Sequence, residues 1–352
     1  MAHSALKKFI IKSLVVWLVP TAILVGLYVW ADPMMDLRAH PNDVSDHHMP
    51  NKGMITLGNF RHYNPLTRFD SFIVGPSSTI AFHADDWARY LPDGARPFIF
   101  DSSSMSIEQL ALSVDYISAH VDTLRNVLFV FFPHGLENEQ TDIWGNVPFR
   151  TAPAIDPSPA RAVSTHWMML SHWYSLGNLG GWLVSKRDPA LLEKFFANRY
   201  AYNTGVEVLD PTVNQEGQPT REAALDARAD SLERADTLWY TRRQPYYNPY
   251  RQEPCLDEID AHRLRHIARL LRARGTSYRF VFAPDKTGQW VHPADMAMFR
   301  QAFGDSLLDL SHPGSPAYPL INNPYNYLDA WHFTPRMARR ILPYIYPNNN
   351  DH

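Results

Sequence analysis

Two short segments, far apart in the chain, carry the residue types that acyl transfer requires. In residues 72–79 (FIVGPSST) an apolar run ends at Gly75, and Ser77 follows two residues later. Near the other end, the sequence DAWH places Asp329 three residues before His332. In a catalytic triad, an acid orients a histidine, and the histidine takes the proton of a serine that attacks an acyl carbon. The pattern predicts Ser77 as nucleophile, His332 as general base and Asp329 as the orienting acid.

Each of these residues also has a purely structural interpretation. A serine that follows a strand often caps the next helix, and a histidine ahead of a helix is often a surface or capping residue. Ser78 is a second candidate nucleophile beside Ser77. The order of the two segments, at the two ends of an α/β pattern, favours the catalytic interpretation.

Apolar runs and amphipathic stretches alternate along much of the chain, as expected for a doubly wound parallel α/β sheet. Continuous apolar runs are typical of strands covered on both faces. The expected strands are 71–75, 97–100, 127–132, 278–283 and 306–310, and the expected helices are 79–90, 106–120, 256–274, 296–303 and 335–345. A serine directly after the first strand would lie at the carboxyl edge of the sheet, where such folds bind ligands, and at a helix N-terminus.

The alternation stops near Pro133 and resumes near Leu256, so residues 135–254 are predicted to be a large helical and irregular insertion. The insertion contains helix candidates at 166–184 and 221–234 and a Tyr- and Pro-rich segment at 239–251. We expect the insertion to cover the carboxyl edge of the sheet. Two interpretations of the aromatic segment are open, namely stacking on sugar rings and packing within the insertion.

The N-terminal region has the features of a membrane anchor. Residues 13–30 contain no charge, and a helix needs about 20 apolar residues to cross a bilayer. Lys7, Lys8 and Lys12 precede this run, which predicts a cytoplasmic N-terminus and an exported domain. Residues 1–31 are therefore predicted to be a cytoplasmic tip and one transmembrane helix. A cleaved signal peptide is the alternative, although the run is longer than the usual apolar core of roughly 7–15 residues.

The remaining chain divides into a linker and a globular domain. Residues 32–69 are polar and rich in His, Pro and Asn, so we expect a juxtamembrane linker with little regular structure. Residues 70–352 form the predicted α/β domain, located in the periplasm or otherwise outside the cytoplasm.

Composition argues against several classes of function. The formal net charge is −3, which gives no reason to expect nucleic acid as a partner. The single cysteine, Cys255, excludes an internal disulfide and a cysteine-based metal site. Sixteen histidines are present, but no His-Glu-x-x-His or similar pairing occurs, so we predict neither a metal site nor a cofactor.

The two segments together resemble those of a known family. Residues 70–77 (DSFIVGPS) and the DAWH segment look like the SGNH/GDSL hydrolase superfamily, and more narrowly its membrane-anchored envelope branch with the DltD-type acyl-transfer proteins. The resemblance implies a flavodoxin-like α/β fold over residues 70–132 and 256–345. It also implies that Ser77 is the nucleophile, Asp329 the acid and His332 the base.

The oxyanion hole departs from the pattern of that family, which commonly uses a glycine and an asparagine after the second and third strands. Residues 101–106 (DSSSMS) contain no glycine, and no asparagine follows the third strand until Asn138. The Ser77 N–H is one candidate donor. The other candidate oxyanion or substrate-binding residues are Ser78, Ser104, Ser106 and Asn138.

The resulting expectation is a membrane-anchored serine esterase or O-acyltransferase, acting most simply on O-acetyl groups of an envelope or exported polysaccharide. Its expected partners are the membrane, the polysaccharide or another acyl-bearing substrate, and a membrane acyl donor or synthase. The alternative is a non-catalytic binding or scaffolding subunit of an envelope polysaccharide assembly with the same fold.

Overall fold

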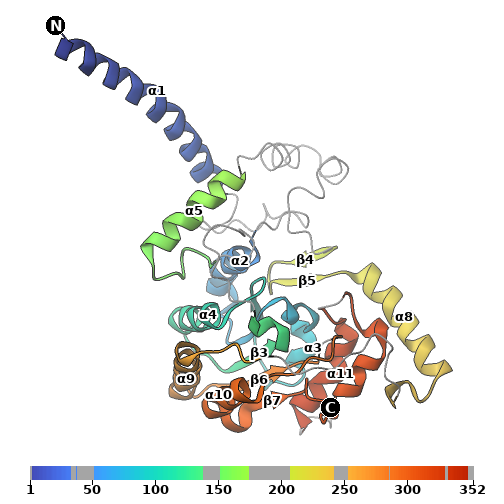
Figure 1. The fold of residues 1–352 in the computed structure, drawn as a ribbon. Helices are drawn as coiled ribbons and strands as arrows, with labels where there is room; N and C mark the ends of the chain where they lie inside the picture. The colour runs from blue at the N-terminus through green and yellow to red at the C-terminus, as the bar shows by residue number, and fades with distance from the viewer. Residues whose placement is uncertain are drawn as a thin grey trace.

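A computed structural model describes residues 2–32, 37, 51–137, 151–173, 207–241, 253–284, 286–329 and 332–347. Figure 1 shows a central sheet with helices on both faces, and a long N-terminal helix that projects away from it. The predicted residues Asn138, 174–184 and 242–251 lie outside the described residues.

The central sheet has five strands, all parallel, in the order β2-β1-β3-β6-β7. The strands are β1 (Ser71–Gly75), β2 (Pro97–Asp101), β3 (Asn126–Phe131), β6 (Ser277–Phe282) and β7 (Leu307–Asp309). Numbered along the chain within this sheet, the order is 2-1-3-4-5, the doubly wound order of flavodoxin-like sheets. The predicted parallel α/β sheet is confirmed, and its topological switch point lies between β1 and β3.

Alternate strand residues pack into two separate apolar layers. Phe72 and Val74 of β1 join one layer, whereas Ile73 joins the other, because successive side chains of a strand point to opposite faces. The first layer contains residues of α2 (Lys52–Thr67), α4 (Ile107–His120), α9 (Glu258–Ala273) and α10 (Pro293–Phe303). The second contains residues of α3 (Ala84–Ala88) and α11 (Pro335–Ile345).

Side-chain caps fix where several of these helices begin. Ser106 and Gln109 form a capping box at the start of α4, in which each side chain bonds the backbone of the other. The Asp257 side chain accepts hydrogen bonds from the N–H groups of Ile259 and Asp260 at the start of α9. Such caps satisfy N–H groups that have no partner within the helix.

Helix α2 overturns the expectation that residues 32–69 have little regular structure. Asn51 caps it by accepting a hydrogen bond from Met54 N at 3.0 Å. Phe60 is 1% exposed, and its ring packs edge-on at 5.9 Å from Phe72 and 5.7 Å from Phe98. The polar side chains around these apolar positions, and Pro65 within the helix, hide the pattern in the sequence. The globular domain therefore begins before residue 70.

The helix predicted at 79–90 is also different, because it is broken into two pieces. Residues Ser77–Ala81 form a 3-10 helix, η2, and α3 begins at Ala84. Between them Phe82 leaves the helical conformation and is fully buried in the second apolar layer. Burial of this ring outweighs the continuity of the helix.

The interruption of the α/β pattern contains more regular structure than expected. Helix α8 (Pro219–Ala235) agrees with the helix predicted at 221–234, and α5 (Pro159–Trp173) overlaps the first part of the one predicted at 166–184. An antiparallel hairpin of β4 (Val208–Asp210) and β5 (Gln215–Gly217) was not predicted, since its strands have only three residues each. Short 3-10 helices complete the description, namely η3 (Pro133–Glu137), η5 (Trp239–Thr241), η6 (Gly304–Ser306), η7 (Tyr318–Asn322) and η8 (Pro324–Asn326).

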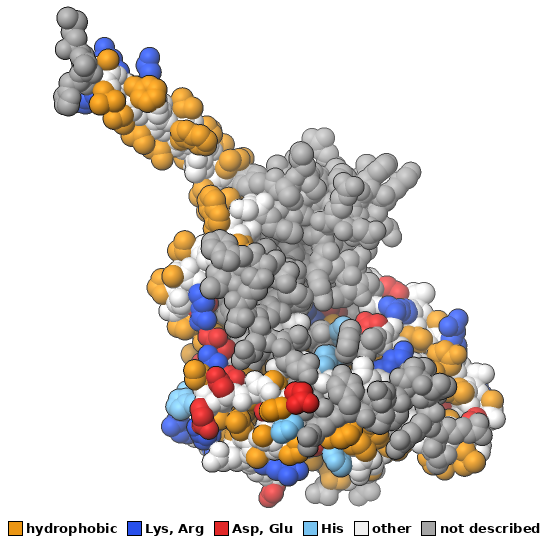
Figure 2. Space-filling model, in the orientation of Figure 1, with side chains coloured by type: hydrophobic (Ala, Val, Ile, Leu, Met, Phe, Trp, Pro, Cys, Tyr) orange, Lys and Arg blue, Asp and Glu red, His pale blue; other side chains and the backbone are white. Residues whose placement is uncertain are grey.

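The N-terminal helix α1 (Ala2–Ala31) is long and apolar enough to cross a bilayer over Ala5–Trp30, with a mean hydropathy of 2.2. Figure 2 shows hydrophobic side chains along this helix and lysine or arginine side chains near its outer end. A signal sequence would meet the same criteria of length and composition. Tyr28, near the end of the helix, is 6% exposed and belongs to the first apolar layer.

The packing of α2 gives a direct test of its place in the domain. Phe60→Ala should lower the free energy of unfolding of the full chain in detergent by about 3–5 kcal/mol, because it leaves a cavity among aromatic rings. Leu66→Ala is the matched control in the same helix, since Leu66 is 75% exposed. Equal denaturation midpoints for the two variants would contradict the burial of α2.

Candidate active site

The end of β1 places Ser77 at the switch point of the sheet. A Cβ on Gly75 would lie 2.4 Å from the Val130 carbonyl oxygen of β3, so only glycine fits here. The Ser78 hydroxyl donates to the same Val130 oxygen at 2.8 Å, and the Thr79 hydroxyl donates to Asp101 Oδ2 at 2.9 Å. Ser77 is thus held between fixed residues while its own side chain remains partly exposed.

A tight loop ahead of α11 presents His332 toward the same edge. Tyr327 and Phe333 form an antiparallel bridge, and Leu328 N donates to the His332 carbonyl oxygen at 2.7 Å. The Tyr327 hydroxyl donates to the Pro284 carbonyl oxygen at 3.1 Å, which ties the loop to the residues after β6. These contacts fold the loop back on itself, with His332 on one arm.

Phe333 anchors that loop against the segment that carries Ser77. Its ring is 1% exposed and packs edge-on against Phe82 at 5.7 Å and Phe132 at 5.3 Å. Phe82 follows η2 and Phe132 follows β3. Phe333 therefore holds the adjacent His332 at the carboxyl edge of the sheet, because it contacts the segments that follow both η2 and β3.

Three residues predicted from the sequence are brought together by these contacts. His332 Nε2 lies 2.8 Å from Ser77 Oγ, and His332 Nδ1 lies 2.8 Å from Asp329 Oδ2 and 3.0 Å from Oδ1. Asp329 Oδ1 also accepts the His332 backbone N–H at 2.8 Å. With Nδ1–H donating to Asp329, Nε2 accepts from the Ser77 hydroxyl. The arrangement can pass a proton from Ser77 to His332.

The candidate oxyanion residues are placed differently. The single hydroxyl proton of Ser78 is used by Val130, and Ser106 caps α4 through both its side chain and its backbone N–H. Ser104 lies in the turn after β2 with a φ of 49°. Helix η2 has only five residues, so its dipole is weaker than that of the longer helix expected after Ser77.

A buried ionic cluster, made of Lys52, Asp101 and Glu216, lies beside η2. Lys52 Nζ is 2.5 Å from Asp101 Oδ2 and 3.2 Å from Glu216 Oε1. Burial would lower the pKa of Lys52, but attraction to Asp101 and Glu216 outweighs it and raises the pKa. Lys52 lies in the presumed linker and Glu216 in the unpredicted hairpin, so neither was predicted as part of the site. The one available signal was Asp101, a carboxylate that ends an apolar strand and needs a buried partner.

Two contacts bring residues 207–235 to the carboxyl edge. Asn214 Nδ2 donates to the Ile99 carbonyl oxygen at 2.8 Å and to Asp101 Oδ1 at 3.1 Å, which ties the hairpin to β2. On the other side, the Arg221 guanidinium of α8 donates to the Leu328 carbonyl oxygen in the histidine loop. That the rest of residues 135–254 also covers the carboxyl edge of the sheet stays a prediction.

Helix α8 is also tied to α11 by a charged network. Glu233 accepts from Arg336 at 3.0 Å, from Arg340 at 2.8 Å and from Asn323 at 2.9 Å. Burial acts to raise the pKa of Glu233, but these hydrogen bonds outweigh burial and bring the pKa to about 2. Because Asn323 precedes the histidine loop and Arg336 follows it, the network braces the loop from α8.

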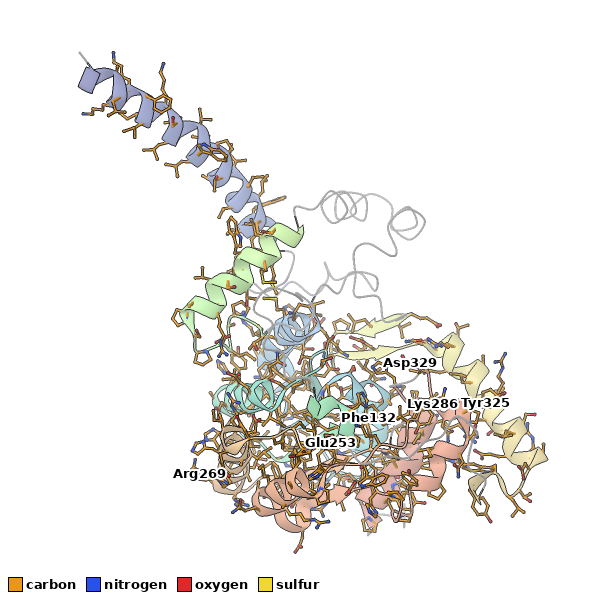
Figure 3. The ribbon with its side chains drawn as sticks, viewed as in Figure 1. Phe132, Glu253, Arg269, Lys286, Tyr325 and Asp329 are labelled. Atoms are coloured by element: carbon orange, nitrogen blue, oxygen red, sulfur yellow. The ribbon has the colours of Figure 1, made fainter. Side chains whose placement is uncertain are left out.

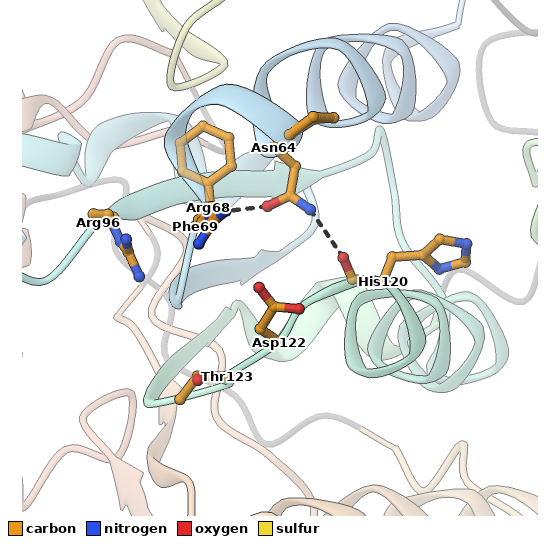
Figure 4. A pocket seen from close by; sticks show the side chains of 8 residues that line it. Asn64, Arg68, Phe69, Arg96, His120, Asp122 and Thr123 are labelled. Carbon is orange, nitrogen blue, oxygen red and sulfur yellow. Dashed lines mark hydrogen bonds between the residues drawn. The ribbon is translucent and has the colours of Figure 1, made fainter.

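Two hollows lie away from the Ser77–His332 pair. One, of about 370 Å³, is lined by Phe69, Arg96 and Thr123 among others, which precede β1, β2 and β3, so it lies at the opposite, amino edge of the sheet (Figure 4). The other, of about 860 Å³, is lined by residues of η5, η7 and α11. There the Arg340 guanidinium lies 5.7 Å from the centre of the Trp239 ring, which supports the packing interpretation for this residue.

Within the parts of the chain that the structure describes, no group of three or more His, Cys, Asp and Glu residues is arranged to hold a metal ion. Cys255 is partly buried, and its backbone N–H donates to Asp295 Oδ2 at 3.1 Å. The Asp295 carboxylate also accepts from Leu256 N at 3.2 Å, so it holds the segment that leads into α9.

Comparison of the sequence with protein-family models and with curated proteins finds no match. The resemblance to the SGNH/GDSL superfamily therefore stays a prediction from the two motifs. The geometry at Ser77, Asp329 and His332 is independent of that resemblance, because it consists of contacts between residues of this chain.

The pKa of Glu233 gives a pH-dependent prediction for the brace between α8 and α11. The ordinary value is 4.5 and the folded value is about 2, so the brace stabilises the fold above pH 4.5 and loses this effect as the pH falls toward 2. Glu233→Gln should lower the free energy of unfolding at pH 7 by about 1 kcal/mol, and the difference from wild type should shrink below pH 4.5. Thermal unfolding as a function of pH measures this.

The control for this prediction is Asp230→Asn. Asp230 also pairs with Arg336, but the Asp230 side chain is 52% exposed. Its effect should be smaller, because water screens an exposed pair. A difference between wild type and Glu233→Gln that stays constant down to pH 2 would contradict the proposed brace.

Proposed function

We propose that this protein is a membrane-anchored serine acyl-ester hydrolase or O-acyltransferase. The observation that carries the proposal is the continuous hydrogen-bond chain from Ser77 Oγ to His332 Nε2 and from His332 Nδ1 to Asp329, each step at 2.8 Å. Serine, histidine and acid in this order and geometry form the machinery of acyl transfer on several unrelated folds. The position of Ser77 at the switch point of a parallel sheet supports the same proposal.

The proposed reaction follows from these roles. Ser77 Oγ attacks the acyl carbonyl carbon while its proton passes to His332 Nε2, and Asp329 holds the resulting imidazolium through Nδ1–H. The leaving alcohol takes the proton from His332, which leaves an acyl-serine. Water or the hydroxyl of an acceptor then gives a proton to His332 and attacks the acyl-serine. The bond between Ser77 Oγ and the acyl carbon then breaks, and His332 Nε2 returns a proton to Ser77 Oγ.

The proposed substrate is an envelope or exported polysaccharide with O-acyl groups, most simply O-acetyl. The support is indirect: one apolar helix precedes the domain, and tethering suits a donor or acceptor that is made at the membrane. A membrane acyl donor or a synthase is the corresponding proposed partner.

The second candidate function is a non-catalytic binding or scaffolding subunit. The observation that favours it is that two candidate donors of an oxyanion hole are already used, because the Ser78 hydroxyl donates to the Val130 carbonyl oxygen and the Ser106 backbone N–H donates to Gln109 Oε1. Labelling with a serine-directed phosphonate separates the two functions, because only an activated Ser77 should react.

The triad gives the central prediction. Ser77→Ala should lower the turnover of a chromogenic acetyl ester by the purified full chain by roughly 10³-fold or more, because the nucleophile is lost. Asp329→Asn should also lower kcat, since an amide does not stabilise the imidazolium. Unfolding temperatures close to that of the wild type would show that the variants are folded.

Ser78→Ala is the neighbouring control for this prediction. It removes a buried hydrogen bond worth about 1 kcal/mol and should retain most of the turnover. If Ser78→Ala abolished turnover while Ser77→Ala retained it, the assignment of the nucleophile would be wrong.

Another prediction of the proposed function concerns the orientation of the chain in the membrane. The lysines ahead of the apolar run predict that the domain lies outside the cytoplasm. A reporter that is active only in the cytoplasm should be silent when fused after His352, and one active only after export should be bright. The reverse pattern would refute the proposed orientation.

A further inference from the structure

One face of helix α5 carries large apolar side chains that the packing of the domain leaves exposed. Val163 is 68% exposed and Trp167 is 62% exposed. Because they are four residues apart, the two side chains lie on the same face of the helix. The opposite face is buried, and Thr165 and Met169 lie on it. Helix α5 is therefore apolar on two faces, of which only one packs within the described part of the chain.

Helix α5 lies at the base of the N-terminal helix. Tyr28 of α1 and Met169 of α5 are buried in the same apolar layer. In Figure 1, α5 lies across the end of α1 that meets the domain. Figure 2 shows hydrophobic side chains that continue from α1 onto this part of the surface. The apolar surface of α1 and the exposed face of α5 are thus on the same side of the domain.

The length of α1 determines how close the domain lies to a bilayer that α1 crosses. The apolar span Ala5–Trp30 has 26 residues, which at about 1.5 Å per residue give a length of roughly 39 Å. The hydrocarbon core and headgroup regions of a bilayer are together about 40–45 Å thick. Tyr28 lies two residues before the end of this span and is already packed against the domain. The surface of the domain around Tyr28 is therefore at the level of the lipid headgroups.

The other end of α5 is tied to the edge of the sheet that carries Ser77. Arg161 Nη1, in the first turn of α5, lies 2.9 Å from Glu108 Oε1, in the first turn of α4. Gln109 of α4 donates to Thr151 Oγ1, ahead of α5, at 3.2 Å. Because α4 follows β2 in a parallel sheet, its first turn lies at the carboxyl edge. Helix α5 therefore connects the base of α1 with that edge.

We propose that the exposed face of α5 is a membrane-contact surface, which rests on the bilayer beside α1 with Val163 and Trp167 among the lipid headgroups and upper acyl chains. The inference rests on the membrane anchor of the proposed function, and it is independent of the chemistry at Ser77. Tryptophan suits this depth, because its ring is apolar and its N–H bonds to water or lipid oxygens. Lipid is the occupant, because the face lies at headgroup level beside a helix whose own apolar surface requires lipid. A second attachment restricts tilting of the domain about the end of α1.

The first test is the depth of a nitroxide label at position 163 in the full chain, reconstituted in phosphatidylcholine vesicles. Cys255→Ser removes the only cysteine, and Val163→Cys then supplies a single site for the label. A label in lipid collides with oxygen, whereas a label in water collides with a water-soluble nickel chelate, so the ratio of the two collision rates gives the depth. We expect the label about 5–10 Å into the boundary between headgroups and acyl chains, as for other interfacial helices.

Two control labels bracket this result. Val16 lies in the middle of α1 and is as exposed as Val163, so a label at Val16→Cys should be deep in lipid. Arg269 is exposed on α9, away from α1 and α5 (Figure 3), so a label at Arg269→Cys should be in water. A label at 163 in water, with the label at 16 in lipid, would overturn the inference and leave the anchor intact. A label at 16 in water would overturn the anchor and the inference together.

A label at 163 that neither reagent reaches would show that protein, such as a second copy of the chain, covers this face. That result would also overturn the inference. The ester assay on the same proteins is independent of these depths, so retained turnover with a water-exposed α5 would count against the membrane contact alone.

A second measurement follows the contribution of Trp167. Adding Trp167→Ser to the protein labelled at 163 should shift the label toward water, because apolar area that holds the helix in the membrane is lost. Leu238→Ser is the matched control, since Leu238 is 51% exposed beyond the end of α8. Unfolding temperatures close to that of the parent protein would show that both variants are folded. An unchanged depth in the folded Trp167→Ser variant would overturn the proposed contact.

Discussion

The buried carboxylate of Asp101 is the point on which the arrangement of the site depends. It ends β2 with 1% exposure and accepts contacts from three separate segments: Lys52 of α2, Thr79 of η2 and Asn214 of the β4–β5 hairpin. A charge taken out of water is tolerated only when partners replace its hydration. This requirement draws a helix, the serine segment and the hairpin to one edge of the sheet.

The loop with His332 is held at the same edge of the sheet by aromatic packing and by ion pairs. Phe333 is packed between Phe82 and Phe132, so the loop with His332 rests on the residues that follow η2 and β3. Glu233 of α8 links to residues before and after that loop. Buried polar contacts therefore hold the serine segment, and aromatic and ionic contacts hold the histidine loop against it. Such double support keeps a proton-transfer distance short without a covalent link.

The carboxyl and amino edges of the central sheet differ in what lies beside them. At the carboxyl edge, Gly75 approaches Val130 so closely that a side chain would not fit, and Ser77 lies immediately beyond. At the amino edge, Asn64 bridges the backbone of Phe69 and His120 beside a small polar hollow. Doubly wound sheets bind their ligands at the carboxyl edge, at the strand pair where the order reverses. The site proposed from side-chain chemistry and the site expected from topology are the same.

The sequence alone predicts the three inner strands, β1, β3 and β6, because each contains a run of apolar residues that is buried on both faces, and this signal is local. It also singled out Ser77, Asp329 and His332, since the two motifs together supply a nucleophile, an acid and a base at the two ends of an α/β pattern. Only the three-dimensional packing shows that α2 belongs to the domain, because Phe60 contacts Phe72 of β1 and Phe98 of β2, and no local pattern in the helix predicts these contacts. It alone placed Lys52 and Glu216 beside each other, across nearly half of the protein's sequence. A buried ion pair between distant segments has no local pattern, because each partner is buried only once the other is present.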